Sequence, residues 1–276
     1  MYRIEKVLNN NSILASKDNQ EVIFLGKGIG FGKKINDIYI PSDGVKKYKM
    51  ETKEQEKRLP HEIIRNVDPV FIEIASDIIR FAQEQFDHVD TKILLPLADH
   101  IDFAIKRIQE NVNMSNPFTK DIELLFPEEY KVALKGKQLI NSITGFEITE
   151  DEVGYITLHV HSAISTDHVG ESMQAMEIIH ESIDKLRKEL NIGTDRNSIS
   201  YIRLMNHIKY LLLRLNTEEK LQMDISDFTQ ERFPFAYERS KEICIRLSKV
   251  MKKEIPQSEI GYLALHLERI LSIELK

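Results

Sequence analysis

Histidine and arginine recur at a fixed spacing in this chain of 276 residues. The segment "DHIDFAIKR" contains His100 and Arg107, and the segment "NHIKYLLLR" contains His207 and Arg214. On a helix, residues with this spacing lie on one face, about two turns from each other. A histidine that shares its face with a cation suits a site for an anion such as a phosphoryl group, whose oxygens arginine binds in a bidentate manner. The residues alone leave open the alternative, which is a solvated arginine on the surface.

A second histidine follows in each half of the chain, and the two halves are copies of each other. "EDEVGYITLH" ends at His159, and "QSEIGYLALH" ends at His266. Four landmarks recur 107 residues later, and they pair as His100 with His207, Pro127 with Pro234, Gly154 with Gly261 and His159 with His266. A constant distance over these landmarks predicts two copies of one helical module, each of roughly a hundred residues.

Other features of the repeat are structural. Gly154 and Gly261 lie inside apolar helical patterns, where glycine costs about 1 kcal/mol relative to alanine. We therefore expect another helix to pack closely at both positions. Thr149 and Glu152 have the spacing of a capping box, which predicts a helix start just before Gly154.

The sequence does not favour a metal site or a redox centre. "LHVH" contains His159 and His161, but on a helix these two residues point about 200° apart and cannot bind one metal ion. The second copy has Glu268 in place of His161. The single cysteine, Cys244, excludes an internal disulfide and a cysteine-rich zinc site, and we expect it to be a small buried residue on a helix. No cofactor is expected.

The stretch "GKGIGFGKK", residues 26–34, has glycine at every second position. Its spacing does not match a dinucleotide fingerprint, and no Gly-Lys is followed by serine or threonine. On an extended segment, alternation would place the glycines on one face and Lys27, Ile29, Phe31 and Lys33 on the other. The bare face would admit another backbone, while two cations and an aromatic ring suit a nucleic-acid strand. The alternative is a glycine-rich corner of a barrel with a core phenylalanine.

The rest of the pattern divides the chain into a β-rich head and a helical body. Apolar alternation and turn residues predict short strands at residues 2–8, 12–16 and 21–25, and residues 38–40 and 46–50 supply one or two further strands. Helical periodicity follows at residues 61–67, 71–86 and 95–109, and "ETKEQEKR", residues 51–58, is the expected linker. The fold class is thus multidomain α and β, with a small sheet followed by two duplicated all-α helical bundles.

Composition and charge agree with this division. Apolar residues make up 42% of the chain, which is enough for a buried core. The net charge is −6, but residues 1–57 carry +3 and the remainder −9, so a slightly basic head precedes an acidic body. The sequence has neither an apolar run of membrane length nor an N-terminal leader, and we expect an intracellular protein without membrane insertion.

The motifs together resemble the BglG/SacY-type transcriptional antiterminators along essentially the whole chain. The resemblance is carried by "KVLNNNSIL", "GKGIGFGKK" and the paired "DH…R" and "GYITLH" segments. It implies a co-antiterminator RNA-binding domain at residues 1–57, which is a four-stranded antiparallel sheet. It also implies two helical PTS regulation domains at residues 58–170 and 171–276. Within the family, "GKGIGFGKK", "NPF" and "LHVHSA" look most like the glucose-system branch.

The resemblance also implies a function, which is regulatory and not enzymatic. A cytoplasmic homodimer would bind a hairpin in the leader mRNA, so that a terminator does not form and transcription continues into sugar-uptake genes. The family's RNA-contacting positions fall on Lys6, Asn9, Asn11, Gly26, Lys27 and Phe31. Its phosphorylated histidines fall on His100, His159, His207 and His266, with HPr and a sugar-specific enzyme II as phosphoryl donors.

Supporting positions can be transferred in the same way. Asp99 matches the "DH" of the first module, whereas the second module has Asn206 there. Arg107 and Arg214 are the candidate phosphoryl-binding cations of the two modules. In the family, phosphorylation of the first module inactivates and that of the second activates many members. A phosphoryl group adds roughly −1.5 to −2 charge, so we expect repulsion or attraction at a subunit contact to carry the signal.

Two other classes of protein were weighed. A metal-dependent phosphohydrolase built on helical His and Asp clusters would show a bound metal and one asymmetric active module. A DNA-binding regulator with the same phosphorylation modules would carry a helix-turn-helix at one end, and the β-rich head argues against it.

Overall fold

The computed structural model describes residues 1–18, 20–50, 58–112, 114–165, 169–190, 198–217 and 219–274. The expected linker falls almost entirely on residues 51–57, which lie outside the described residues. The chain forms two compact units. The first contains Met1–Met114 and Lys131–Ile164, and the second contains Ser115–Tyr130 and Ser165–Lys276.

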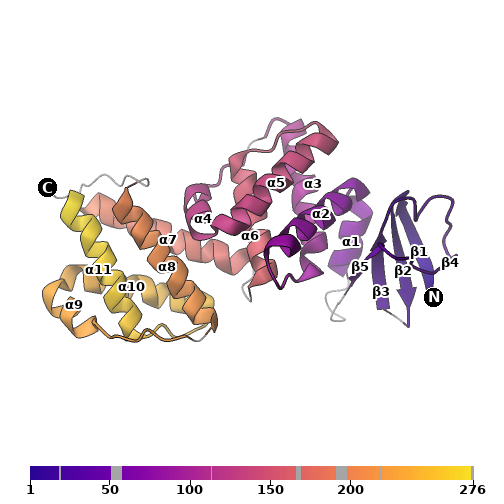
Figure 1. The fold of residues 1–276 in the computed structure, drawn as a ribbon. Helices are drawn as coiled ribbons and strands as arrows, with labels where there is room; N and C mark the ends of the chain where they lie inside the picture. The colour runs from indigo at the N-terminus through magenta and orange to yellow at the C-terminus, as the bar shows by residue number, and fades with distance from the viewer. Residues whose placement is uncertain are drawn as a thin grey trace. The chain divides into compact units, whose positions relative to one another are not determined.

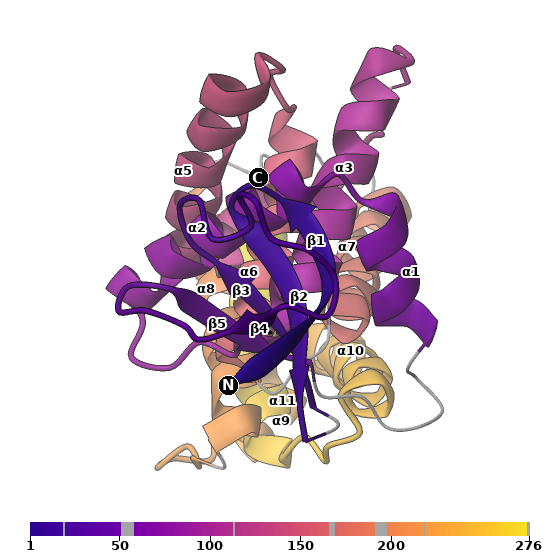
Figure 2. The ribbon, with the colours of Figure 1, turned by 90° about the vertical axis from the view of Figure 1, so that its right-hand side faces the viewer.

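An antiparallel sheet opens the first unit, as the sequence predicts (Figures 1 and 2). Its strands are β1 (Tyr2–Asn9), β2 (Ser12–Lys17), β3 (Gln20–Leu25), β4 (Ile38–Tyr39) and β5 (Lys46–Lys49), in the spatial order β4-β1-β2-β3-β5. The sheet has five strands rather than four because the short β4 pairs with the start of β1, where Tyr39 lies opposite Tyr2. Alternation along β2 and β3 gives the sheet two different faces.

One face of the sheet is covered by its own loops. Ile4, Ile13, Phe24 and Tyr39 form a buried cluster there, and Ile29 from the glycine stretch packs against it. The other face carries the alternate residues of the strands. Ile23 and Tyr48 are cross-strand partners on that face, and both are buried.

Five helices follow among the described residues of the first unit, with a short 3₁₀ helix (Thr91–Ile93) between the second and third of them. They are α1 (Arg58–Asn66), α2 (Pro69–Gln85), α3 (Leu94–Gln109), α6 (Glu150–Ile164) and most of α5 (Pro127–Thr144). The Asp68 side chain accepts a hydrogen bond from the Val70 N–H at the start of α2, and Pro69 fits the first helical position. The helix start predicted before Gly154 is confirmed, and the Glu152 N–H donates to the Thr149 Oγ1 at 3.3 Å, which is one half of a capping box; the Glu152 carboxylate binds Arg107 instead.

The second unit is helical throughout its described residues. It contains α4 (Thr119–Leu125), α7 (Val169–Leu190), α8 (Ile199–Thr217), α9 (Ser226–Arg232), α10 (Pro234–Met251) and α11 (Gln257–Glu274). The buried Tyr201 hydroxyl of α8 donates to the Asp121 carboxylate of α4 at 2.7 Å, which fixes α4 on α8. Cys244 is buried on α10 as predicted, and burial raises the pKa of its thiol to about 12.

The helix starts confirm the repeat. Helices α4, α5 and α6 begin at residues 119, 127 and 150, and α9, α10 and α11 begin 107 residues later in each case. Close packing at Gly261 is also confirmed, because a Cβ there would lie 2.8 Å from the Ser226 Cα at the start of α9. In the part of the chain that the structure describes, none of the helices combines the length and apolar character needed to cross a membrane.

Candidate RNA interface and histidine pairs

The structure brings the asparagine and glycine motifs of the head together. The Gly26 N–H donates to the Asn11 carbonyl oxygen at 2.9 Å, and the Gly30 N–H donates to the Asn10 carbonyl oxygen at 2.9 Å. The Asn11 side chain accepts a third bond, from the Gly28 N–H at 2.9 Å. The β1–β2 turn and the loop after β3 therefore form one continuous surface.

The glycine stretch is not extended, and that expectation is wrong. The N–H groups of Ile29, Phe31 and Lys33 each donate to the carbonyl three residues earlier, so the stretch is a succession of turns. Gly28 and Gly32 have φ values of +72° and +69°, which explains why glycine is needed in these turns. The residues between the glycines consequently do not share one face. Ile29 packs against the core, while Lys27 and Phe31 are exposed.

Two expectations about this stretch can now be judged. Phe31 is 75% exposed, so the alternative of a core phenylalanine is wrong and the ring is available for stacking. The close approach of another backbone is confirmed at Gly30, where a Cβ would lie 2.1 Å from the Asn9 carbonyl oxygen. Only glycine permits this contact between the two motifs.

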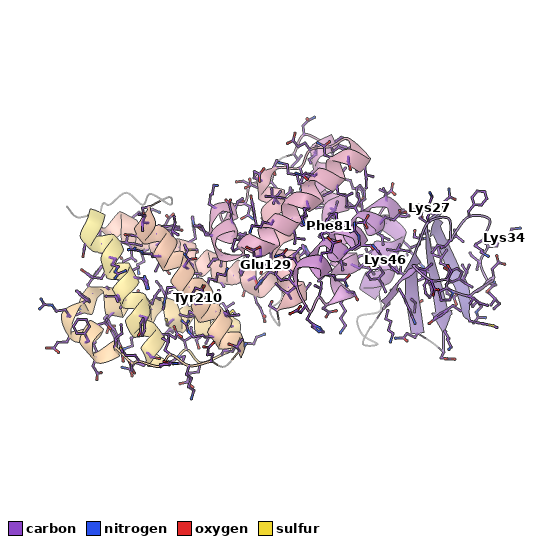
Figure 3. The ribbon with its side chains drawn as sticks, in the orientation of Figure 1. Lys27, Lys34, Lys46, Phe81, Glu129 and Tyr210 are labelled. Atoms are coloured by element: carbon purple, nitrogen blue, oxygen red, sulfur yellow. The ribbon has the colours of Figure 1, made fainter. Side chains whose placement is uncertain are left out.

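The remaining predicted RNA contacts lie where the sheet meets the helices of its own unit. The Asn9 and Asn11 side chains both donate to the Glu73 carboxylate on α2, at 2.7 and 3.3 Å. The Lys6 ammonium donates to the Ile64 carbonyl oxygen at 3.0 Å. Sequence reasoning missed Lys46, whose ammonium lies 3.2 Å from the Asp77 carboxylate. Figure 3 shows Lys46 between the sheet and the helices.

The four candidate histidines lie in two pairs, one in each unit. The ring centroids of His100 on α3 and His159 on α6 are 5.3 Å apart. Those of His207 on α8 and His266 on α11 are 4.8 Å apart. The repeat predicts that the two modules match, and each pair does join the equivalent helices of its module, but the contact within a pair is seen only in the structure.

A buried glutamate holds the arginine beside each pair. Arg107 donates to Glu152 at 2.5 Å, and Arg214 makes two hydrogen bonds to Glu259, at 2.6 and 2.8 Å. The arginine side chains are 11% and 15% exposed, so the alternative of solvated surface arginines is wrong. The sequence predicts only a helix-capping role for Glu152 and does not mark Glu259, although the two lie 107 residues apart and belong to the repeat.

Burial keeps members of both pairs neutral. Burial, together with the neighbouring His100, lowers the pKa of His159 to about 3. Burial, His266 and Arg214 lower the pKa of His207 to about 3. A neutral imidazole has a nitrogen lone pair, which is what a phosphoryl acceptor needs.

The glutamate also contacts the histidine in the first pair. The His100 Nε2 lies 3.1 Å from a Glu152 carboxylate oxygen. Burial favours the neutral acid, but hydrogen bonding to His100 and Arg107 outweighs it and holds the pKa of Glu152 below its ordinary value. Asp99, which the resemblance places beside His100, is exposed on α3.

Among the described residues, no cluster of three or more His, Cys, Asp or Glu side chains could hold a metal ion.

Similarity to known proteins agrees with this division of the chain. The sequence profile of the CAT RNA binding domain matches residues 2–57, and that of the PRD domain matches residues 72–163 and 180–270. Protein GlcT of Staphylococcus aureus, in the bovine RF122 / ET3-1 and Newman strains, is 32% identical over 273 residues. The match covers 96% of this chain and 95% of GlcT. The chain belongs to the GlcT-like family of transcriptional antiterminators.

A solved structure supports the assignment at the level of the fold. The crystal structure of GlcT CAT-PRDI matches with a TM-score of 0.52 and 37% identity, covering 59% of this chain and 98% of that chain. The predicted resemblance is confirmed, including the likeness to the glucose branch. This GlcT-like antiterminator is an RNA-binding regulator of phosphotransferase-system genes and not an enzyme.

Proposed function

We propose that this antiterminator acts in the cytoplasm as a homodimer and stabilises a hairpin in the leader mRNA upstream of a sugar-uptake gene. The observation that carries the proposal is the continuous surface formed by the Asn9–Asn11 turn and the Gly26–Gly30 loop. Lys27 and Phe31 project from it, and they offer a cation for phosphate and a ring for base stacking. The domain boundaries 1–57, 58–170 and 171–276 are part of the proposal.

The RNA surface is tested by binding of the full-length chain to leader RNA transcribed in vitro. Lys27→Ala should weaken binding and reduce the dependence of log K on log salt by about 0.7–0.9. Phe31→Ala should cost about 1–3 kcal/mol of binding free energy with a smaller change in salt dependence. Lys17→Ala is the matched control, since Lys17 is exposed at the opposite end of β2. If neither Lys27→Ala nor Phe31→Ala changed binding, the assigned surface would be wrong.

We further propose that His100, His159, His207 and His266 accept phosphoryl groups from HPr and from a sugar-specific enzyme II. The pairing of the rings, the neutral state of His159 and His207, and the arginine held beside each pair support this chemistry. A phosphoryl group at a pair would compete with the glutamate for the arginine, because both are anionic oxygen acceptors. Such an exchange would loosen the contact between the two helices of the pair and so alter the packing of the module.

Phosphorylation is tested by incubating the chain with labelled phospho-HPr and, separately, with labelled phospho-enzyme II. Each histidine is replaced in turn by alanine, and the labelled peptides are mapped. His180→Ala serves as the control, since it removes a histidine outside both pairs. Aspartate at His100 and His159 should weaken RNA binding and shift the dimer, measured by light scattering, toward monomer. Unchanged RNA affinity and mass in this double variant would refute the inhibitory role of the first pair.

A further inference from the structure

The face of the sheet that bears Lys6 and Lys46 is occupied by the chain itself. Four amide and ammonium side chains there make polar contacts with helices of the first unit, and they are Lys6, Asn9, Asn11 and Lys46. Three of these four are candidate RNA contacts. On the apolar part of the same face, the buried Tyr48 hydroxyl lies 2.7 Å from the Ser76 hydroxyl of α2.

The helix side of this contact is acidic. Glu73 and Asp77 are four residues apart on α2 and therefore lie on one helical face, one turn from each other. Glu73 accepts from both asparagines, while Asp77 lies 3.2 Å from the Lys46 ammonium. Carboxylate and phosphate oxygens are both anionic acceptors that form charge-assisted hydrogen bonds with amide and ammonium donors. The helix thus offers the sheet the kind of acceptor that an RNA backbone would offer.

The space left between the two surfaces is small. A cavity of about 220 Å³ lies between the sheet and α2. It is lined by Asn11, Gly26 and Lys27 from the RNA side and by Glu73, Ser76 and Asp77 from the helix side. Sites that enclose even a drug-sized ligand measure about 300–1,000 Å³. While α2 stays in place, its carboxylates occupy hydrogen-bonding groups of Asn9, Asn11 and Lys46 that an RNA strand would otherwise contact.

We propose that the acidic face of α2, formed by Glu73 and Asp77, binds the RNA-contacting face of the sheet and competes with RNA for it. This inference rests on the RNA surface of the proposed function. Lys27 and Phe31 stay exposed beside the contact, so RNA meets them first and then displaces α2 from the asparagines. The apparent affinity for RNA is the intrinsic affinity reduced by the fraction of chains in which α2 has left the sheet.

The arrangement also links the RNA surface to the first histidine pair. Helix α2 packs against α3, which carries His100. A phosphoryl charge at His100 that shifts α3 would change how firmly α2 is held on the sheet. The competition therefore gives the first module a way to act on RNA binding within a single chain.

The test compares Glu73→Ala with Glu84→Ala in the full-length chain. Both changes remove one carboxylate from α2, but Glu84 is exposed and pairs with Arg80. Affinity is measured for leader RNA transcribed in vitro, at fixed salt. Glu73→Ala should bind at least about fivefold more tightly than the parent, since the hydrogen bonds from both asparagines to Glu73 are lost from the closed form. Glu84→Ala should bind like the parent, and circular dichroism checks that both variants are folded.

A second variant keeps the test independent of any one substitution. Asp77→Asn removes the partner of Lys46 and should also tighten RNA binding. If Glu73→Ala and Asp77→Asn bind no more tightly than the parent, the competition is refuted. Lys27→Ala separates this failure from failure of the RNA surface itself. If Lys27→Ala weakens RNA binding but the two α2 variants do not tighten it, the proposed RNA surface is supported and only the competition by α2 is refuted.

Discussion

The ion pair between Arg214 and Glu259 is the contact whose loss should cost the second unit most. Two hydrogen bonds, at 2.6 and 2.8 Å, join side chains that are only 15% and 4% exposed. Replacing Arg214 with methionine keeps much of the aliphatic stem but removes the charge. Glu259 would then be a buried carboxylate without its cation, and breaking a buried pair in this way costs about 3–5 kcal/mol.

The glutamate provides the second arm of a double-mutant cycle. Glu259→Gln keeps the shape of the side chain and leaves Arg214, which is less deeply buried, as the unpaired partner. The double variant Arg214→Met/Glu259→Gln should be more stable than Arg214→Met alone, because the uncompensated carboxylate is gone. We expect a coupling energy of about 2 kcal/mol or more from the cycle, within the range found for residues in direct contact.

A matched control comes from the same unit. Arg246 on α10 and Glu181 on α7 also form an interhelical pair, at 2.5 Å, but their side chains are 43% and 54% exposed. Arg246→Met should cost no more than about 1 kcal/mol, because exposed pairs gain little in water. Unfolding by urea is followed by circular dichroism, since the chain has no tryptophan. If Arg214→Met costs no more than Arg246→Met, burial does not set the strength of this pair.

Two further results are expected in the first unit. Gly30→Ala should destabilise the sheet by about 1–3 kcal/mol, because its Cβ would lie 2.1 Å from the Asn9 carbonyl oxygen. Gly170→Ala, where a Cβ meets nothing within 4 Å, should not, and equal melting temperatures would contradict this. The unfolded chain protonates His159 near pH 6.5 and the folded chain near pH 3, so stability falls as pH drops through this window. Between pH 7 and 5 the His159 share of this loss is about 2 kcal/mol by urea unfolding, and His159→Gln should remove that share while His207, whose pKa is also lowered to about 3, keeps its own.

The elements of the fold could be predicted because each has a strong local period. The alternation in residues 2–25 predicts the three long strands, and the 3.6-residue period predicts α2 and α3 to within a few residues. The repeat register shows that His100 corresponds to His207 and His159 to His266, whereas the contact between the two histidines of one module depends on tertiary packing. The prediction of an extended segment at residues 26–34 is wrong, because glycine at every second position is also compatible with a series of turns. The positive φ angles of Gly28 and Gly32, which decide between the two, are not visible in the sequence.

The partners of the functional residues could be predicted only where the repeat marks them. Glu152 stands beside Glu150 and Asp151, and its spacing from Thr149 singles it out for a role at the helix start but not as the partner of an arginine. Its match to Glu259 is the one signal that could have found it. Glu73 has no such match among the motifs, and its contact with Asn11 joins residues 62 positions apart. A contact of this range depends on how the sheet and helix dock, which no local pattern encodes.

The two histidine pairs share their residues but not their electrostatics. In the first module, Glu152 contacts both Arg107 and His100, which lies 3.1 Å away. In the second, both oxygens of Glu259 are used by Arg214, and the His207 Nε2 lies 3.8 Å away. In the first pair, burial lowers the pKa of His159, on α6, to about 3. In the second pair the histidine with a pKa lowered to about 3 is His207, on α8, which is the equivalent of His100 and not of His159. The duplication therefore preserved the scaffold of arginine and glutamate while the environment of the equivalent histidines diverged. Two modules with the same helices and the same arginine–glutamate pair can therefore respond differently to a phosphoryl group.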